Sequence, residues 1–331
     1  MSQLPEIHLV ATGGTIAGSA SNTTDTANYS AAALSADTLL AALPEAGAIA
    51  RITSEQLFAR DSKDLQPTDW LRLAQRLREL IAQEGGPAGI VVTHGTDTIE
   101  ETAFFLALTL PRTVPVVLTA AMRPATARSA DGPMNLLQAI AAAADPRFAT
   151  AGPLVAANDR LWRARDVTKR HTHAPEALGG FDAAPYATAV GTQWLPPRWQ
   201  PTDAAPRFAG ELPAALPDVW ILPGYAGAPA ELIDHAISKG VRGLVLALAG
   251  HGSVPTAWEP AIDRALAADI AIVRASRVPV GGVTPNANYA DSTRGTIASA
   301  ALSPMQARVL LMLCLALGNQ PDEIREHFTK D

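Results

Sequence analysis

Short apolar runs alternate with amphipathic segments along most of the chain. Continuous apolar runs are typical of strands that are buried on both faces of a parallel sheet. We therefore predict strands at residues 7–11, 89–93, 114–119, 219–222, 243–248 and 270–273. Trp70, Leu73 and Leu77 recur at helical spacing before Gly85, which predicts a helix that Thr68 can cap. Further helices follow the later strands, and one of them begins near Pro229.

This rhythm breaks once, near the middle of the chain. Residues 191–217 are rich in Pro, Arg, Ala and Asp and have little periodicity, which is typical of a surface linker. We predict an N-terminal domain over 1–195, a linker over 196–216 and a C-terminal domain over 217–331. The predicted fold is α/β, with two domains that each contain a mainly parallel sheet flanked by helices. No internal repeat and no long disordered segment is expected.

Length and charge narrow the possible functions. The 331 residues fit two domains, and 26 basic against 32 acidic side chains give a net charge of −6. A mildly acidic chain is a poor ligand for nucleic acid or for an anionic membrane surface, so neither partner is expected. Cys314 is the only cysteine, which excludes an intramolecular disulfide. The N-terminus has no secretory leader pattern, so a cytoplasmic location is expected, or a periplasmic one if a leader was removed.

The first candidate site is the sequence A-T-G-G-T-I-A-G at residues 11–18, directly after the first predicted strand. Ligands of open α/β sheets bind at the carboxyl ends of the strands. Gly13 and Gly14 allow a sharp turn and leave the hydroxyl of Thr15 accessible. Two alternatives are an ordinary strand-to-helix turn and a dinucleotide loop, although neither the G-x-G-x-x-G nor the Walker spacing is present.

The second candidate site is the sequence V-T-H-G-T-D-T-I-E-E-T at residues 92–102, again directly after a predicted strand. Thr96 and Asp97 stand at the start of the helix that follows. A purely structural alternative fits as well, because Asp97 or Thr98 can serve as N-cap and Glu100 or Glu101 can complete a capping box.

Taken together, the two segments resemble the T-G-G-T-I and H-G-T-D-T signatures of the asparaginase/glutaminase family. Five more segments agree with the family and extend the resemblance over essentially the whole chain, at residues 61–64, 121–124, 129–135, 165–169 and 307–311. The chain is most similar to the branch called type II, which is typically exported and selective for asparagine. The resemblance implies an asparaginase-like fold and hydrolysis of L-asparagine to L-aspartate and ammonia.

The resemblance also implies a role for each catalytic position. Thr15 would be the nucleophile that forms an acyl-enzyme, and Tyr29, on a flexible polar segment, would help to activate it. Thr96, Asp97 and Lys169 would form a second constellation in the floor of the pocket. Without the resemblance, the basic stretch around Lys169 is typical of a solvated face, and Tyr29 of an ordinary surface loop. No cofactor is implied.

Substrate binding is implied for a further set of positions. Ser62 would bind the α-carboxylate and Asp97 the α-ammonium of the substrate, while the backbone of Thr96 and Ala121 would face the scissile amide. Gly14 and Asp61 are further expected binding residues. Ser62 is otherwise explained as a turn residue. No metal is expected, because the His171 and His173 pair has no recognisable third ligand, and His94 is expected to support its loop rather than to catalyse.

The family resemblance implies a homotetramer built from two close dimers, with each site closed by the C-terminal domain of a neighbouring subunit. Two departures from the family concern that closure. Ser253 stands where many relatives have asparagine, and Asn288 stands where relatives offer a glutamate to the substrate ammonium. A shifted loop register, with Asp291 in the role of Asn288, is the alternative.

Three other functions are alternatives to asparagine hydrolysis. A glutaminase-asparaginase of broad specificity is close, because one methylene is worth only about 1–3 kcal/mol of discrimination. The asparaginase-like subunit of a tRNA-dependent amidotransferase carries an extra N-terminal domain, whereas the first strand here is predicted to begin at Ile7. A non-catalytic binding module would not need the catalytic-type side chains that this chain retains.

Overall fold

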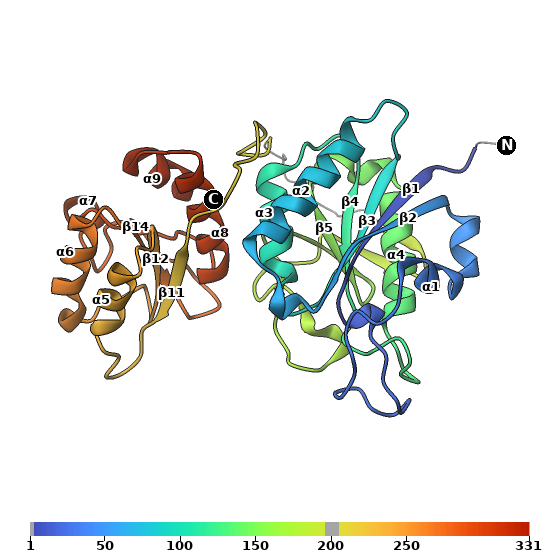
Figure 1. Cartoon of the computed structure of the whole chain (residues 1–331), viewed down its shortest axis with the longest axis horizontal. Coiled ribbons are helices and arrows are strands. Elements are labelled where there is room, and N and C mark those ends of the chain that lie inside the picture. Colours follow the sequence, from blue (N-terminus) through green and yellow to red (C-terminus); the bar gives the residue numbers. More distant parts are fainter. Residues whose placement is uncertain (1–2, 196–204, 331) are drawn as a thin grey trace. The chain divides into compact units, whose positions relative to one another are not determined.

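The computed structural model describes residues 3–195 and 205–330, so residues 196–204 of the predicted linker lie outside the described residues. The chain divides into two compact units, Met1–Leu212 and Pro213–Asp331. Each unit contains a mainly parallel sheet flanked by helices, which confirms the predicted α/β fold class (Figure 1).

Eight of the described strands form the sheet of the first unit, in the order β10-β9-β6-β5-β4-β3-β1-β2. The strands from β2 to β5 pair in parallel, and β6, β9 and β10 add an antiparallel extension. Their bounds are β1 Glu6–Gly13, β2 Arg51–Arg60, β3 Gly89–Thr93, β4 Val116–Thr119, β5 Leu154–Ala157, β6 Arg160–Arg163, β9 Ala187–Val190 and β10 Gln193–Leu195. A separate antiparallel pair is formed by β7 Thr168–Lys169 and β8 Leu178–Gly179.

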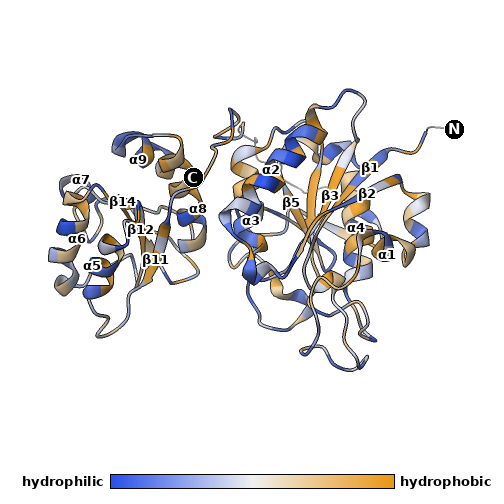
Figure 2. Cartoon of the chain, viewed as in Figure 1, coloured by the Kyte–Doolittle hydropathy of each residue, from blue (hydrophilic) through white to orange (hydrophobic). Residues whose placement is uncertain are grey.

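Helices cover both faces of this sheet, which explains why its central strands are continuously apolar. Figure 1 shows α2 and α3 on one face and α1 and α4 on the other. Every residue of β3 and β4 is buried, and Figure 2 shows these strands as hydrophobic ribbons between amphipathic helices. The bounds are α1 Ala36–Ala41, α2 Pro67–Ala82, α3 Ile99–Thr109 and α4 Gly132–Ala143.

The start of α2 differs from the sequence prediction. Gln66, not Thr68, is the N-cap, and its side chain forms a capping box with Asp69. Pro67 occupies the first helical position, where its missing N–H costs no hydrogen bond, and so fixes the helix start one residue after Gln66. The predicted apolar face is correct, because Trp70 and Leu73 are buried and the Trp70 ring stacks on Phe105 with centroids 5.8 Å apart.

Part of the predicted linker bonds to the first unit. The Phe208 N–H donates to the Leu108 carbonyl over 2.9 Å, and the Arg78 guanidinium donates to the Phe208 carbonyl over 3.0 Å. These contacts tie residues after the undescribed segment to α2 and α3.

The second unit repeats the layered plan with four parallel strands in the order β11-β12-β13-β14. Helices again lie on both faces (Figure 1), and α8 is buried along most of its length, including Cys314. No helix in residues 3–195 and 205–330 is long and apolar enough to cross a bilayer. The bounds are β11 Val219–Pro223, α5 Glu231–Ser238, β12 Gly243–Leu248, α6 Glu259–Ala267, β13 Ala271–Ser276, α7 Asp291–Arg294, β14 Ile297–Ala298, α8 Pro304–Ala316 and α9 Pro321–Thr329.

Candidate active site

Two glycines allow the loops that carry the candidate catalytic residues to pack closely together. β1 and β3 are adjacent parallel strands, so the loops that follow them leave the same edge of the sheet. Gly14 has a φ of 81°, and a Cβ there would lie 2.5 Å from the Gly95 nitrogen. A Cβ on Gly95 would in turn lie 2.5 Å from the Ser62 hydroxyl. Any side chain at either glycine would push the three loops apart, so glycine is required for their close approach.

Thr15 begins the short 3-10 turn Thr15–Ala17 directly after Gly14, and its side chain is buried. Its Oγ1 atom lies 2.8 Å from the phenolic oxygen of Tyr29, and either group can donate in this hydrogen bond. The structure therefore brings together the two residues that the sequence predicts for nucleophilic attack, and Tyr29 is not an ordinary surface residue.

Tyr29 belongs to a polar loop over residues 19–30 that hydrogen bonds hold at its base. Ser19 and Ser30 exchange two backbone hydrogen bonds of 3.0 and 2.9 Å. The Ala20 N–H donates to the Thr126 hydroxyl over 2.9 Å, which ties the loop to the segment after β4. Asp25 organises the tip by accepting from the backbone of Asn28. These hydrogen bonds hold the loop that carries Tyr29 beside Thr15.

Thr96, Asp97 and Lys169 form the predicted second constellation. The Lys169 ammonium donates to the Thr96 hydroxyl over 2.9 Å and to the Asp97 carboxylate over 2.5 Å. The Lys169 side chain is 21% exposed, against 48% for Asp97, so the lysine does not lie on a solvated face. A threonine hydroxyl, an ammonium and a carboxylate in sequence can pass a proton along hydrogen bonds.

The start of α3 rejects the capping alternative. Thr98 is the N-cap residue, yet its side chain accepts no backbone hydrogen bond and instead donates to the Ser62 carbonyl over 2.9 Å. The Asp97 carboxylate is bonded to Lys169. The Glu100 carboxylate accepts from the Lys169 backbone N–H over 3.1 Å, so this side chain contacts β7. The side chains of Asp97, Thr98 and Glu100, which the capping alternative assigns to the end of α3, contact other parts of the site instead.

Ser62 and Asp61 differ in whether their side chains already have a hydrogen-bond partner within the described residues. Ser62 is buried, and within the described part of the chain its hydroxyl has no hydrogen-bond partner. It therefore keeps its donor and its acceptor capacity for a ligand. The Asp61 carboxylate, by contrast, is bonded to the Lys63 ammonium. Of the two predicted binding residues on this segment, Ser62 has the hydroxyl that is ready for a substrate.

His94 supports the second loop from a fully buried position. Its Nδ1 atom lies 2.8 Å from the Gly95 carbonyl oxygen. Burial lowers the pKa of His94 to about 4, so its ring is neutral near pH 7. Because a carbonyl can only accept, we assign the single ring proton to Nδ1. This bond fixes the Gly95–Thr96 peptide, as expected for a supporting residue.

Ala121 is buried two residues beyond the end of β4. The next two backbone N–H groups, of Met122 and Arg123, both donate to the Asp131 carboxylate over 2.9 Å. These two bonds fix the course of the backbone at Ala121. The site edge of the sheet is therefore rigid on this side as well.

The His171 and His173 rings contact one another, with centroids 4.5 Å apart. The His171 Nδ1 atom accepts the Ala174 backbone N–H over 3.0 Å. Across residues 3–195 and 205–330, no three His, Cys, Asp or Glu side chains are grouped as a metal site requires. The histidine pair thus has a local structural explanation.

The two candidate residues of the second unit lie on exposed turns. Ser253 closes a tight turn with Ala249, and Asn288 adopts a left-handed φ of 63°. Asp291 is buried, and its two carboxylate oxygens accept from the Arg274 guanidinium, each over 2.6 Å. Because that carboxylate is engaged inside the unit, Asn288 is the accessible residue of the two.

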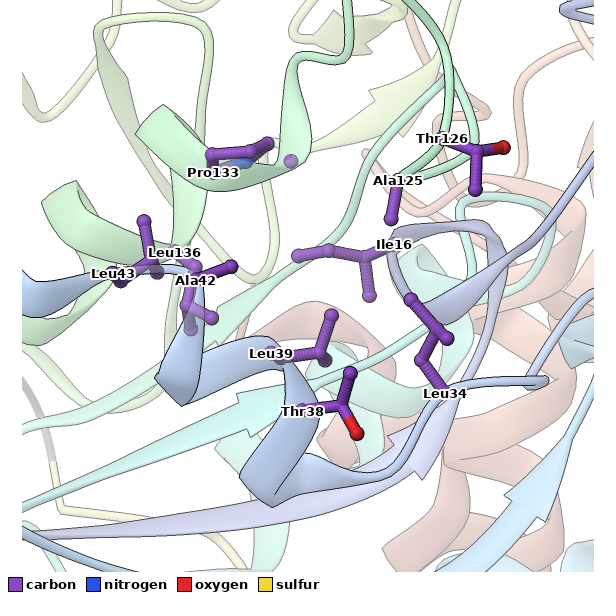
Figure 3. Close-up of a pocket in the computed structure, with 11 residues that line it drawn as sticks. Ile16, Leu34, Thr38, Leu39, Ala42, Leu43, Ala125, Thr126, Pro133 and Leu136 are labelled. Atoms are coloured by element: carbon purple, nitrogen blue, oxygen red, sulfur yellow. The ribbon is translucent and has the colours of Figure 1, made fainter. Parts of the chain in front are cut away.

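An apolar pocket of about 180 Å³ lies beside the Thr15 loop (Figure 3). Ile16 points into it from the 3-10 turn, and Leu34, Leu39 and Leu136 line other walls. No charged side chain lines the pocket, so it offers nothing to the two charges of an amino acid. Groups suited to a charged ligand lie on the polar loops and not in the lining of this pocket.

Comparison with known families agrees with this geometry. Residues 6–200 match the family described as "Asparaginase, N-terminal", and residues 218–328 match "Glutaminase/Asparaginase C-terminal domain". The chain belongs to the asparaginase family. The two matched regions together leave only short segments of the chain unassigned.

Individual family members are similar over nearly their whole length. The "Probable L-asparaginase periplasmic" of Haemophilus influenzae is 41% identical over 99% of this chain and 93% of its own. "L-asparaginase 2" of Escherichia coli is 37% identical over 99% and 93%. The solved structure of the "Probable Cytoplasmic L-asparaginase" of Campylobacter jejuni superposes with a TM-score of 0.93, at 36% identity over 99% of this chain and 100% of that one.

Glu100 is a site residue that the sequence prediction used only as a possible cap. Burial raises the pKa of Glu100, although hydrogen bonds from the Thr168 side chain and the Lys169 backbone favour its charged form. The available signal was its position, four residues after Thr96 in the same motif and in the first turn of α3. Its partner β7 is distant in sequence, so the contact itself was not predictable.

Proposed function

We propose that this protein is an L-asparaginase, which hydrolyses the side-chain amide of L-asparagine to L-aspartate and ammonia. The observation that carries the proposal is a pair of hydroxyl sites on adjoining loops. Thr15 is bonded to Tyr29 on one loop, and Thr96 is bonded to Lys169 on the other. Relatives named L-asparaginase, at 37–41% identity over 99% of the chain, support the same activity.

In the first half-reaction, the Thr15 oxygen attacks the amide carbon of the substrate. Tyr29 hydrogen-bonds the Thr15 hydroxyl and takes up its proton during the attack, as the phenolic proton of Tyr29 passes to the departing nitrogen. The new C–O bond forms, the C–N bond breaks, and the nitrogen leaves as ammonia with the transferred proton. Backbone N–H groups near Thr96 and Ala121 stabilise the transient oxyanion, because their dipoles are fixed before the reaction.

In the second half-reaction, water hydrolyses the ester on Thr15. Thr96 accepts a proton from the attacking water as its own proton passes to Lys169, which in turn gives one of its ammonium protons to the Asp97 carboxylate. The C–O bond to Thr15 breaks, its oxygen regains the proton that the relay took from the water, and aspartate is released. Each threonine then has one function, which follows from the group that is bonded to it.

Substrate recognition uses the remaining polar groups of the loops. The Ser62 hydroxyl, which has no partner within the described residues, donates to the α-carboxylate. Asp97 accepts from the α-ammonium with the part of its carboxylate that Lys169 leaves exposed. Gly14 keeps the backbone close to the substrate, and Asp61 holds Lys63 beside Ser62.

Ammonia release from L-asparagine tests this function directly. The unmodified protein should release ammonia, and Thr15→Ala should lower turnover by at least about 1,000-fold, because no acyl-enzyme can form. Thr329→Ala is the matched control, since its hydroxyl lies at the end of α9 and donates to the Glu326 carbonyl of its own helix. A Thr15→Ala protein with ordinary turnover would refute the proposed nucleophile.

A glutaminase-asparaginase of broad specificity is the second candidate. Two relatives carry that name, from Acinetobacter glutaminasificans at 36% identity and Pseudomonas fluorescens at 33%. The ratio of kcat/KM for asparagine to that for glutamine decides between the two. A ratio above about 100 supports the asparaginase, and a ratio near one supports the broad enzyme.

The proposed assembly is a homotetramer of two close dimers in the cytoplasm. In it, the exposed Ser253 and Asn288 turns of one subunit reach the substrate of a neighbour. Light scattering should give a tetramer mass for the active enzyme, and fractionation of native cells should find the activity in the cytosol. A fully active monomer would contradict the assembly, and activity confined to the periplasm would contradict the location.

A further inference from the structure

Lys169 is held at both ends by one short stretch of the chain. Its ammonium bonds Thr96 and Asp97 over 2.9 and 2.5 Å, and its backbone N–H donates to the Glu100 carboxylate over 3.1 Å. The lysine side chain therefore closes a ring between the loop after β3 and the first turn of α3. A flexible four-carbon stem reaches a fixed hydroxyl reproducibly only when its own backbone is fixed.

The strand that carries Lys169 has little other support on that side. β7 consists of two residues and pairs with β8 alone, with Thr168 opposite Gly179 and Lys169 opposite Leu178. The Lys169 N–H bonds Glu100 instead of a strand. The Glu100 carboxylate thus takes the place that a third strand would have next to β7.

We propose that Glu100 is a positioning residue that sets the reach of Lys169 toward Thr96. The inference rests on the proposed function, because it assigns Lys169 a part in the reaction. Glu100 also accepts a hydrogen bond from the Thr168 side chain, so one carboxylate fixes both residues of β7. Its position, and not its negative charge, is the property that Lys169 requires.

Three substitutions separate position from charge. Glu100→Gln keeps the length and an accepting oxygen but removes the charge, whereas Glu100→Asp keeps the charge and withdraws the oxygens by one methylene. Glu100→Ala removes both. Glu101→Ala is the matched control, since Glu101 is the next residue in the same first turn of α3 and has the same charge relative to the helix end.

The expected pattern is a selective loss of kcat. Glu100→Ala and Glu100→Asp should each lower kcat by about 10- to 100-fold, because a displacement of about 1 Å at a catalytic group has an effect of that size. KM for asparagine should change by less than about 3-fold, since Ser62 and the substrate contacts are untouched. Glu100→Gln and Glu101→Ala should retain kcat within about 3-fold.

A second measurement reports on Lys169 without any turnover. The rate at which an amine-reactive reagent modifies Lys169, followed by mass spectrometry of its peptide, should rise in Glu100→Asp and stay unchanged in Glu100→Gln. An unmodified protein that releases no ammonia would refute the proposed function, while this labelling pattern would still support the positioning role.

Two results would overturn the proposal. One is an active Glu100→Asp with an inactive Glu100→Gln, which would mean that charge matters and position does not. The other is kcat and labelling that are unchanged in both folded variants. If Glu100→Ala does not fold, the Asp and Gln variants decide the question alone.

Discussion

The two threonine sites of the first unit carry the same chemical group and are built in different ways. Thr15 bonds Tyr29, which stands on a polar loop closed by backbone hydrogen bonds between Ser19 and Ser30. Thr96 bonds Lys169, which is attached to a strand and, through Glu100, to a helix. The first partner can leave with its loop, whereas the second cannot move without the framework.

This difference matches the two tasks of the proposed reaction. In the proposed reaction, substrate binds at Thr15 and product leaves from it. A partner on a loop that can open is an advantage there. Water activation at Thr96 needs a proton acceptor in a constant position throughout the cycle. A polar loop closed by backbone hydrogen bonds and a lysine bonded to the start of a helix provide these two properties.

Lys169→Met is the strongest test of the Thr96 site. The methionine keeps the length and apolar stem but removes the ammonium that bonds Thr96, so kcat should fall by about 100-fold or more. Steady-state kinetics on asparagine measure the loss. Lys239→Met, at an exposed position of the second unit, is the control and should leave kcat unchanged. A kcat that survives in Lys169→Met would remove the lysine from the mechanism.

The buried His94 of the same loop should make the free energy of unfolding depend on pH. Burial lowers the pKa of His94 from 6.5 to about 4, so between these values the unfolded chain binds a proton that the folded chain does not. Stability should therefore fall as pH drops through this window, by roughly 3 kcal/mol from this group. Denaturant unfolding of the unmodified protein and of His94→Asn should differ by that amount in pH dependence. Parallel curves would refute full burial of the ring.

Tyr29→Phe tests the Thr15 site, and its expected effect is smaller. Removing the phenolic oxygen deletes the 2.8 Å hydrogen bond to Thr15 and leaves the ring in place. We expect kcat to fall by about 10- to 100-fold with little change in KM, because the bond acts on the nucleophile. Tyr225→Phe, on an exposed turn of the second unit, is the control. An unchanged kcat in Tyr29→Phe would mean that another group takes the Thr15 proton.

Asn288→Glu carries the smallest expected effect and extends the comparison to the second unit. A carboxylate here should lower KM for asparagine by about 3-fold, since a charged acceptor binds an ammonium more strongly than an amide does. The left-handed φ of 63° disfavours glutamate and reduces this gain. The KM of the variant is the measurement, and an unchanged KM would place Asn288 outside the site. Asp291→Asn is unsuitable as a control because it would leave the buried Arg274 without its counter-charge.

Much of the fold follows from local sequence patterns. β3 and β12 coincide with predicted apolar runs because both are covered on two faces, which leaves no polar alternation to blur their ends. The side of the sheet that bears the site was predictable too, since the carboxyl ends of parallel strands meet at one edge. The start of α2 was not, because Gln66 and Thr68 can each cap a helix and Pro67 decides between them.

The site was predictable only as far as its motifs reach. Thr15 and Thr96 stand in short segments with recognisable residues, whereas Lys169 lies in a basic stretch that has no local sign of burial. Glu100 looked like a capping residue because its real partner is far away in sequence. Contacts between distant segments depend on tertiary packing, which a pattern of nearby residues does not record.

The most direct test of the central claim is the site of covalent attachment. A slowly hydrolysed asparagine analogue should accumulate as an ester, and mass spectrometry of the digested protein should find the added mass on the peptide that contains Thr15. The same experiment with Tyr29→Phe should give slower attachment to the same peptide. Attachment to the peptide that contains Thr96 would contradict the account, because it would exchange the roles of the two threonine sites.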